Sequence, residues 1–294
     1  MRRMATAAQW IEGARVRTLP NSVAPVIVGA GAAGAVERFN WWASLLALVV
    51  ALGLQVGVNY ANDYSDGVRG TDADRVGPLR LVGSGVAAPR AVLVAAFGCF
   101  GVAGLTGVVL VALTGHWWLL SVGAACVAGA WFYTGGARPY GYSGWGEAAV
   151  FVFFGLVAVL GTQYVQAGTV TWLGVGGAVA LGAFSAAVLV ANNLRDVPTD
   201  RVSGKRTLAV RLGDRRTRTL YFGLVAVPFA VSIVAAVANI WVLVTLLAAV
   251  LVIPAVRIVA RGRDGLALIP VLRDTALAML AWAVFAGVAF GFGG

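Results

Sequence analysis

Residues 43–75 read ASLLALVVALGLQVGVNYANDYSDGVRGTDADR, an apolar run followed directly by a cluster of acids. The apolar part, residues 43–58, is long enough to reach across most of a bilayer, because a spanning helix needs about 20 such residues. The part after it holds four of the twelve acidic residues of the chain, Asp63, Asp66, Asp72 and Asp74. Acids at the end of a membrane helix are costly and indicate a functional site, although a solvated loop explains a single cluster equally well.

The composition of the whole chain is that of a membrane protein. Of its 294 residues, 60% are hydrophobic and 12% are charged, whereas soluble proteins have about 25% charged residues. Nine apolar runs in the sequence approach the length of a membrane span. They cover residues 20–36, 41–61, 91–113, 117–133, 148–166, 171–193, 220–238, 240–259 and 275–292. The sequence therefore predicts an all-α fold of nine transmembrane helices, in which residues 1–294 form one transmembrane domain.

Lys and Arg residues are distributed unevenly between the predicted loops. Of the 22 in the chain, 21 precede the first span or lie in alternate loops after it, a pattern that places those segments in the cytoplasm. The N-terminus is therefore predicted to be cytoplasmic and the C-terminus external. The cytoplasmic side also carries 11 of the 12 acids. Its net positive charge suits contact with anionic membrane lipid. We therefore predict a multi-pass protein of the plasma membrane. We expect it to bind no nucleic acid.

Four polar side chains share one face of the predicted helix that begins at residue 41. Gln55 is followed by Asn59, Asn62 and Asp66 at offsets of 4, 7 and 11 residues, which place all four on one stripe of an α-helix. A polar stripe on a membrane helix faces a cavity or the interior of the bundle. Gln and Asn also hold membrane helices together through hydrogen bonds, and for Gln55 and Asn59 that interpretation stays open.

A second acid cluster lies 130 residues downstream of the first. ANDYSD at 61–66 aligns with ANNLRD at 191–196, so each copy has an Asn four residues before an Asp. Both copies are predicted at the cytoplasmic end of a helix, which indicates a duplication of helices 1–4 and 5–8 in a pseudo-twofold bundle, with the ninth helix outside it. Two such helix C-termini carry partial negative charge and together predict a divalent metal site. Pro198 is predicted to end the second helix before Asp200.

Basic residues are interleaved with the first acid cluster, at Arg69, Arg75 and Arg80. Acids together with arginines suit a cation bound to an anion, of which a Mg²⁺-bridged phosphate is the commonest example. The cytoplasmic loop 133–147, YTGGARPYGYSGWGE, adds Arg138 among aromatic rings, either as an interfacial aromatic belt or as a lid over the site. A charged mouth on an apolar cavity suits a substrate with a charged head and a lipid tail, such as a prenyl diphosphate.

Seven segments carry a resemblance to a known family. They are ARVRTLP at 14–20, NYANDYSDGVRGTDADRVGPLRLVGSG at 59–85, YTGGARPYGYSGWGE at 133–147, VFVFFGLVAVLGT at 150–162, VANNLRDVPTD at 190–200, TLAVRLG at 207–213 and LIPVLRDT at 268–275. Over its full length the chain resembles the UbiA superfamily of intramembrane aromatic prenyltransferases. The GTDADR spacing and the YTGGARPYGY loop are similar to the branch that prenylates 1,4-dihydroxy-2-naphthoate in menaquinone synthesis.

The resemblance implies a reaction and a set of site residues. A polyprenyl group would pass from polyprenyl diphosphate to 1,4-dihydroxy-2-naphthoate, with loss of diphosphate and CO2, to give demethylmenaquinone, and Mg²⁺ would be the cofactor. The implied metal ligands are Asn62, Asp66, Asn192, Asp196 and Asp200. The implied catalytic acids are Asp63, Asp66, Asp196 and Asp200. The residues implied in substrate binding are Arg17, Asn59, Arg69, Asp72, Tyr133, Arg138 and Lys205.

The chain departs from the family pattern at one metal-binding position, and other functions remain as alternatives. The third acid of N-x3-D-x3-D is replaced by Gly70 in the first copy, so that role is assigned to Asp72. The same transfer to hydroxybenzoate or homogentisate is one alternative. A cation-coupled transporter is another, although transporter sites lie near the midplane. A CDP-alcohol phosphotransferase shares only D-x-x-D-G at 63–67. The sequence leaves a homo-oligomer open.

Overall fold

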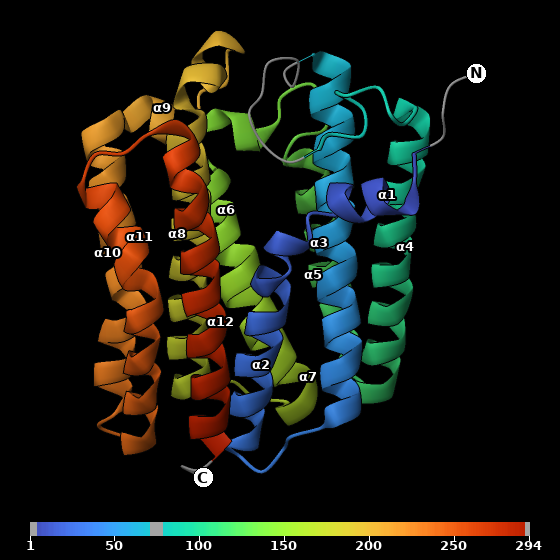
Figure 1. Ribbon diagram of the computed structural model, residues 1–294. Helices are drawn as coiled ribbons and strands as arrows, with labels where there is room; N and C mark the ends of the chain where they lie inside the picture. Colours follow the sequence, from blue (N-terminus) through green and yellow to red (C-terminus); the bar gives the residue numbers. More distant parts are fainter. Residues whose placement is uncertain (1–4, 71–78, 292–294) are drawn as a thin grey trace.

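The computed structural model describes residues 5–70 and 79–291. Every regular element in these two ranges is a helix, and the long helices stand side by side (Figure 1), so the predicted all-α fold is confirmed. Seven of the helical rods described are long and apolar enough to cross a membrane. They run over Trp41–Arg69, Pro89–Thr114, Gly146–Ala167, Trp172–Val202, Asp214–Ala235, Ile240–Ala260 and Gly265–Gly291.

Two of the nine predicted spans correspond to shorter helices. α2 (Pro20–Gly34) has 15 residues and α5 (Leu119–Phe132) has 14, against the roughly 20 that a spanning helix needs. Nine membrane crossings therefore stay a prediction. The chain before α2 forms a short helix, α1 (Ala7–Gly13), and a 3₁₀ turn, η1 (Val16–Thr18).

The helices fall into two halves along the chain. The first half consists of α1, η1, α2, α3 (Trp41–Arg69), α4 (Pro89–Thr114) and α5. The second half opens, after the turn η2 (Tyr140–Ser143), with one rod made of α6 (Gly146–Val150), the π-helix η3 (Phe151–Leu160) and α7 (Gly161–Ala167). It continues with α8 (Trp172–Val202), α9 (Leu208–Leu212), α10 (Asp214–Ala235), η4 (Ile240–Ala248), α11 (Ala249–Ala260), η5 (Gly265–Leu268) and α12 (Ile269–Gly291).

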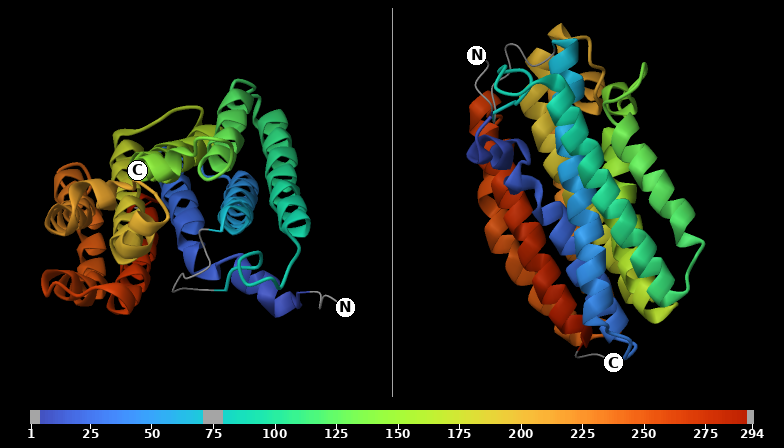
Figure 2. Two further views of the ribbon diagram at one scale, coloured as in Figure 1. Left: turned by 90° about the horizontal axis from the view of Figure 1, so that it is seen from above. Right: turned by 90° about the vertical axis from the view of Figure 1, so that its right-hand side faces the viewer.

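α2 connects the two halves. It packs against α3 on one side and against α8 and α12 on the other, and the end-on view in Figure 2 shows it between them. A Cβ atom at Gly31 would lie 2.6 Å from the Cα of Gly287 on α12. Because only glycine permits that approach, this pair lets the short helix pack closely against α12.

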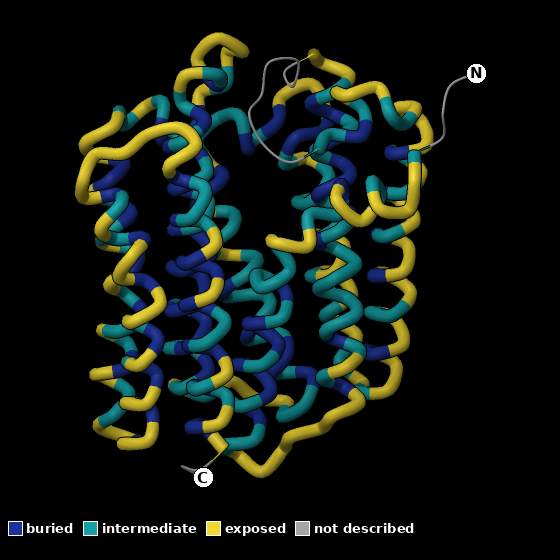
Figure 3. The backbone as a smooth tube through the Cα atoms, in the orientation of Figure 1, coloured by how far each residue is buried: buried dark blue, intermediate teal, exposed yellow. Residues whose placement is uncertain are grey.

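The buried core is concentrated in the second half. Trp282, Tyr221, Phe184 and Phe290 are among its largest fully buried side chains, and the hydroxyl of Tyr221 lies 2.7 Å from that of Thr275. The first half has smaller buried clusters, and α5 has no buried residue at all. Figure 3 shows the same contrast along the tube. The helices of the second half therefore pack densely against one another, whereas those of the first half bury fewer side chains.

α3 extends further than the sequence predicted, and this places its acids on a helix. Asn40 caps its start by accepting a hydrogen bond from the N–H of Ala43 at 3.0 Å. The helix continues past residue 61 to Arg69 and ends at Gly70, whose φ of 72° is the left-handed conformation that glycine adopts without strain. Asn62 and Asp66 therefore lie one turn apart on the same helix.

The prediction that Pro198 ends the second acidic helix was wrong. α8 runs through Pro198 to Val202, and Ser203 N–H still donates to the backbone oxygen of Thr199 at 3.0 Å. Membrane helices tolerate an internal proline where neighbouring groups satisfy the backbone. As a result Asp200 lies on the helix, one turn beyond Asp196.

Candidate active site

A cavity of about 600 Å³ lies inside the bundle, between helices of both halves. Its charged and amide side chains near the ends of α3 and α8 are Asn62, Asp66, Arg80, Asn192, Asn193, Asp196, Asp200 and Lys205. Apolar side chains from α3, α4, α5 and η3 form most of the remaining wall, among them Leu54, Val108, Leu120, Phe153 and Phe154. Such a cavity suits a ligand with a charged head and an apolar tail.

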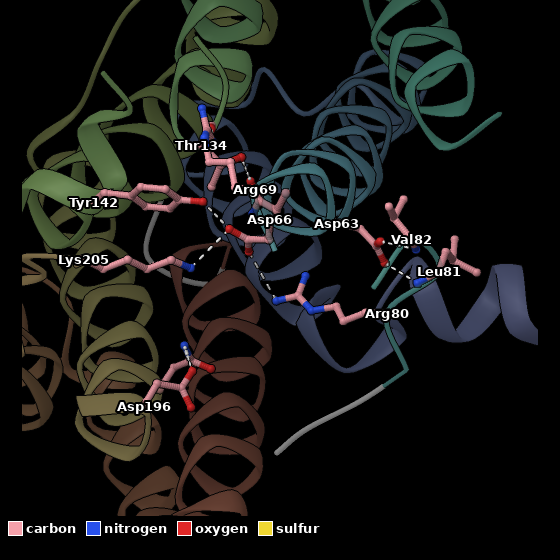
Figure 4. A network of polar contacts seen from close by, with 12 residues as sticks. Asp63, Asp66, Arg69, Arg80, Leu81, Val82, Thr134, Tyr142, Asp196 and Lys205 are labelled. Carbon is pink, nitrogen blue, oxygen red and sulfur yellow. Dashed lines mark hydrogen bonds and ion pairs between the residues drawn. The ribbon is translucent and has the colours of Figure 1, made fainter. Parts of the chain in front are cut away.

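Asp66 is the centre of the polar end (Figure 4). Its carboxylate accepts a hydrogen bond from the hydroxyl of Tyr142 and pairs with Lys205 Nζ at 3.1 Å and with Arg80 Nη2 at 3.6 Å. Asp66 is only 4% exposed, and a buried charge needs such partners. Lys205 follows α8 in the second half, so the two halves of the chain meet at this carboxylate.

The acids of α8 line the same cavity. Arg195 donates from Nε and Nη2 to the two carboxylate oxygens of Asp196, at 2.7 and 2.8 Å, and from Nη2 to Asn192 Oδ1 at 2.9 Å. Asp200 accepts a hydrogen bond from Thr207 at 3.4 Å. Asp196 and Asp200 are both buried. The structure thus brings the oxygen-bearing side chains of both acid motifs to one cavity.

The loop 133–147 covers the polar end. Thr134 Oγ1 donates to Asn62 Oδ1 at 2.7 Å, and the hydroxyl of Tyr142 donates to Asp66. Arg69 donates to the backbone oxygens of Thr134 and Gly136, which ties the loop to the end of α3. Lys205 Nζ lies 4.5 Å from the centroid of the Tyr142 ring, within cation–π range. These contacts support the interpretation of the loop as a lid.

The phenols of this loop remain protonated at neutral pH. Burial, with a further contribution from the charge of Asp66, raises the pKa of Tyr142 above its ordinary value. Burial also raises the pKa of Tyr133, and it raises the pKa of Tyr140 to about 12. The Tyr142 hydroxyl is therefore a stable donor to the Asp66 carboxylate.

Asp63 lies outside the cavity lining, and its contacts favour a structural role over the predicted catalytic one. Its Oδ2 accepts a hydrogen bond from the N–H of Leu81 at 2.8 Å and its Oδ1 accepts one from the N–H of Val82 at 2.9 Å. Figure 4 shows the carboxylate turned towards these amides and away from Asp66. Asp63 thus fixes the chain around Arg80, so we assign it a structural role.

Replacing Asp63 with Ala should destabilise the protein more than it impairs the chemistry. The buried N–H of Leu81 and the partly buried N–H of Val82 would lose their acceptor, and a buried group left unpaired costs about 1–3 kcal/mol. Thermal unfolding in detergent measures the loss, and Glu37→Ala is the control because Glu37 is an exposed acid and such surface substitutions usually change stability by about 0.5 kcal/mol or less. An unchanged unfolding midpoint with lost activity would return Asp63 to the catalytic acids.

The other predicted substrate-binding residues are divided between the cavity and the surface. Asn59, Tyr133 and Lys205 line the cavity. Arg17 and Arg138 are exposed and lie outside its lining, while Arg69 binds the lid backbone instead of the cavity. Asp72 lies outside the described residues.

Five residues that the structure places at or beside the polar site and the cavity were not among the site residues predicted from the sequence. They are Arg15, Arg80, Thr134, Tyr142 and Arg195. Arg195 directly precedes Asp196 in the ANNLRD motif, and that adjacency was a usable signal. Arg80 was one of three arginines near the first acids. It reaches the site because the next two residues, Leu81 and Val82, bind Asp63 through their backbone N–H groups.

The family model described as the UbiA prenyltransferase family matches residues 22–269. The chain belongs to the UbiA prenyltransferase family. It is 60% identical over 290 residues to the 1,4-dihydroxy-2-naphthoate octaprenyltransferase of Mycobacterium tuberculosis, with 99% of each chain covered. It is 38% identical over 275 residues to the protein of the same name from Escherichia coli, with 90% of this chain and 89% of that one covered. The family predicted from the sequence motifs is confirmed.

Solved structures of UbiA homologues share the fold. A homologue from Archaeoglobus fulgidus bound to GPP and Mg²⁺ has a TM-score of 0.70 at 12% identity, with 97% of this chain and 99% of that chain covered. The apo homologue from Aeropyrum pernix has a TM-score of 0.68 at 16% identity, with 92% and 96% covered. The arrangement of helices around the cavity is thus the UbiA fold.

The donor set at the polar end fits magnesium. Among the described residues, no group of three or more His, Cys, Asp or Glu side chains could hold a metal ion alone. Mg²⁺ does not need such a cage, because it keeps several waters and is usually bound by one or two carboxylates together with substrate phosphates. Asp66 and Asp196, with the amide oxygens of Asn62 and Asn192, supply the hard oxygen donors that it prefers.

Proposed function

We propose that this UbiA family member transfers a polyprenyl group from polyprenyl diphosphate to 1,4-dihydroxy-2-naphthoate, in a Mg²⁺-dependent reaction that yields diphosphate, CO2 and the hydroquinone form of demethylmenaquinone, which a separate oxidation converts to the quinone. The observation that carries the proposal is a cavity that joins the acids of α3 and α8, together with Arg80 and Lys205, to an apolar interior. The choice of acceptor is supported by relatives named 1,4-dihydroxy-2-naphthoate octaprenyltransferase. The choice of metal and donor is supported by the Archaeoglobus homologue with GPP and Mg²⁺.

Five side chains would hold the metal together with the diphosphate. They are Asn62, Asp66, Asn192, Asp196 and Asp200, all of which line the cavity. When bound, Mg²⁺ neutralises charge on the departing diphosphate.

The cations of the chain bind the diphosphate oxygens. Lys205 and Arg80 approach Asp66 from different segments, so both present positive charge at the place where the phosphates bind. Charge-assisted hydrogen bonds from these groups hold the leaving group and strengthen as the allylic carbon–oxygen bond breaks. Tyr142 orients the Asp66 carboxylate through its donated hydrogen bond.

The apolar walls hold the prenyl chain and keep water from the reactive carbon. Aliphatic and aromatic residues from α3, α4, α5 and η3 surround this part of the cavity. Water would otherwise capture the allylic cation, so a dry cavity directs it to the aromatic acceptor.

We place the protein in the plasma membrane with the acid site facing the cytoplasm. The proposal includes nine crossings, with α2 and α5 as short ones, and a single domain built from two repeats of four helices and a ninth helix. The orientation is supported by the basic residues, of which 21 of 22 belong to one side. Asp66 and Asp196 both lie near the helix ends assigned to that side.

An assay of the purified protein in detergent tests the proposed reaction. With Mg²⁺, octaprenyl diphosphate and 1,4-dihydroxy-2-naphthoate, it should release diphosphate and CO2 in equal amounts and form a prenylated product detectable by mass spectrometry. EDTA should stop the reaction, and added Mg²⁺ should restore it. Turnover only with 4-hydroxybenzoate or homogentisate would reassign the acceptor, whereas no turnover with any of the three would contradict the proposed chemistry.

A further inference from the structure

The segment TLAVRLG at 207–213 carries part of the family resemblance, yet most of it lies away from the substrate cavity. Its first residue, Thr207, lines the cavity and donates a hydrogen bond to Asp200 at 3.4 Å. Arg211, on α9, is exposed and lies outside the cavity lining. A role for Arg211 in the reaction must therefore pass through the residues that it contacts.

Two of the side chains that contact Asp66 are joined to each other through the backbone. Tyr142 reaches Asp66 from the lid, and Lys205 reaches it from the segment after α8 (Figure 4). Arg206, which follows Lys205, donates its backbone N–H to the carbonyl oxygen of Tyr142 at 2.9 Å. The lid and the segment after α8 are therefore held together at the place where both reach Asp66.

Arg211 contacts both sides of this junction. Its Nε donates to the backbone oxygen of Arg206 at 3.2 Å, so Arg206 binds the lid through its N–H and Arg211 through its C=O. The lid also passes close to the side chain of Arg211, because a Cβ atom at Gly144 would lie 3.1 Å from Arg211 Nε and 3.2 Å from its Cδ. The φ of Gly144 is 80°, a conformation that glycine adopts without strain. Glycine at 144 thus lets the lid backbone lie against Arg211.

We propose that Arg211 is a positioning residue for the diphosphate site: through Arg206 and Gly144 it keeps Lys205 and Tyr142 aligned on Asp66. The inference rests on the proposed function, in which Lys205 binds the diphosphate. A lysine has a long side chain with several rotatable bonds, and ordering it during binding lowers affinity. A cation that is already in place binds the phosphates without that loss. Removal of Arg211 should therefore weaken diphosphate binding and spare the aromatic acceptor.

The test compares Arg211→Met, which keeps a long side chain and removes its donors, with Arg215→Met, which removes an exposed arginine at the start of α10. Calorimetry measures the dissociation constants of a non-reactive prenyl thiodiphosphate with Mg²⁺ and, separately, of 1,4-dihydroxy-2-naphthoate. Arg211→Met should weaken thiodiphosphate binding roughly 3- to 10-fold and leave naphthoate binding unchanged. Arg215→Met should change neither, and Arg211→Lys, which retains a donor, should be intermediate.

Two further measurements show whether Arg211 acts through Lys205 and the lid. In Lys205→Gln the aligned cation is already absent, so the added Arg211→Met change should weaken thiodiphosphate binding by about twofold or less. Hydrogen exchange of the full-length protein, followed by mass spectrometry, should be faster in Arg211→Met over residues 133–147 and 203–213, because the bond between Arg206 and Tyr142 opens more often. Arg215→Met should exchange like the native protein in both segments.

Several results would overturn the inference while the proposed function stands. One is an equal effect of Arg211→Met and Arg215→Met on thiodiphosphate binding, and another is an equal loss of affinity for the thiodiphosphate and the naphthoate. A full additional loss in the Lys205→Gln protein, or unchanged hydrogen exchange in both segments, would also contradict it. Failure of the native protein to bind the thiodiphosphate would instead overturn the proposed function, and the inference with it.

Discussion

Asp66→Asn should lower kcat/KM for prenyl transfer by roughly 10²–10³-fold or more, the size of effect seen when one preorganised electrostatic group is removed from an active site. The substitution keeps the shape of the side chain but removes the charge that Lys205, Arg80 and Tyr142 all contact. Without that charge the two cations lose their common partner, and the metal loses a carboxylate from α3. Initial rates of diphosphate release, at saturating acceptor, measure the change.

The matched comparison for Asp66→Asn is the Asp63→Ala variant described above. The two acids are three residues apart on α3, yet only Asp66 lines the cavity. We expect Asp66→Asn to lose activity while it keeps most of its thermal stability, and Asp63→Ala to do the opposite. Loss of stability without a specific loss of activity in Asp66→Asn would make Asp66 a structural residue.

Asp196→Asn should have the second largest effect and should also change the requirement for metal. Asp196 is buried on α8, and both of its carboxylate oxygens accept hydrogen bonds from Arg195. Removal of its charge leaves Arg195 without its ionic partner and removes the carboxylate that α8 offers to the metal. We expect activity to fall by roughly 10²-fold or more and the Mg²⁺ concentration for half-maximal rate to rise about 10- to 100-fold.

Asp264→Asn is the control for Asp196→Asn. Asp264 is also an acid paired with an arginine, Arg218, but its side chain is 78% exposed and it lies outside the cavity lining. It should leave both the rate and the Mg²⁺ requirement unchanged. A Mg²⁺ requirement in Asp196→Asn that equals that of the native protein would mean that α8 does not contribute to metal binding.

The sequence predicted the acids of the cavity because two local patterns agree. Asp66 and Asp196 each follow an apolar run of spanning length, each lies four residues after an Asn, and helical spacing then sets the face on which they project. Those spacings are local along the chain, so they could be recognised without knowledge of the three-dimensional structure. The structure adds that both helices continue beyond the predicted borders, because Pro198 does not end α8 and α3 ends only at Gly70.

The rest of the site depends on contacts between distant segments. Asp63 resembles Asp66 in sequence, but the backbone at Leu81 and Val82 returns to it and uses its carboxylate. Arg15 lines the cavity and Arg17 does not. Arg15 is in the left-handed conformation, and no periodic pattern predicts a positive φ at an arginine. The lid residue Tyr142 reaches Asp66 across 76 positions of the chain. Such pairings follow from how the helices pack and not from spacing.

The central claim is that acids from α3 and α8 form one metal-dependent diphosphate site. It is tested most directly by equilibrium binding of a non-reactive prenyl thiodiphosphate to the native protein, Asp66→Asn and Asp196→Asn, each with Mg²⁺ and with EDTA. The account predicts that native binding requires Mg²⁺ and that each substitution weakens it roughly 10-fold or more. Native binding that is equally tight in EDTA, or unchanged affinity in both variants, would contradict the account.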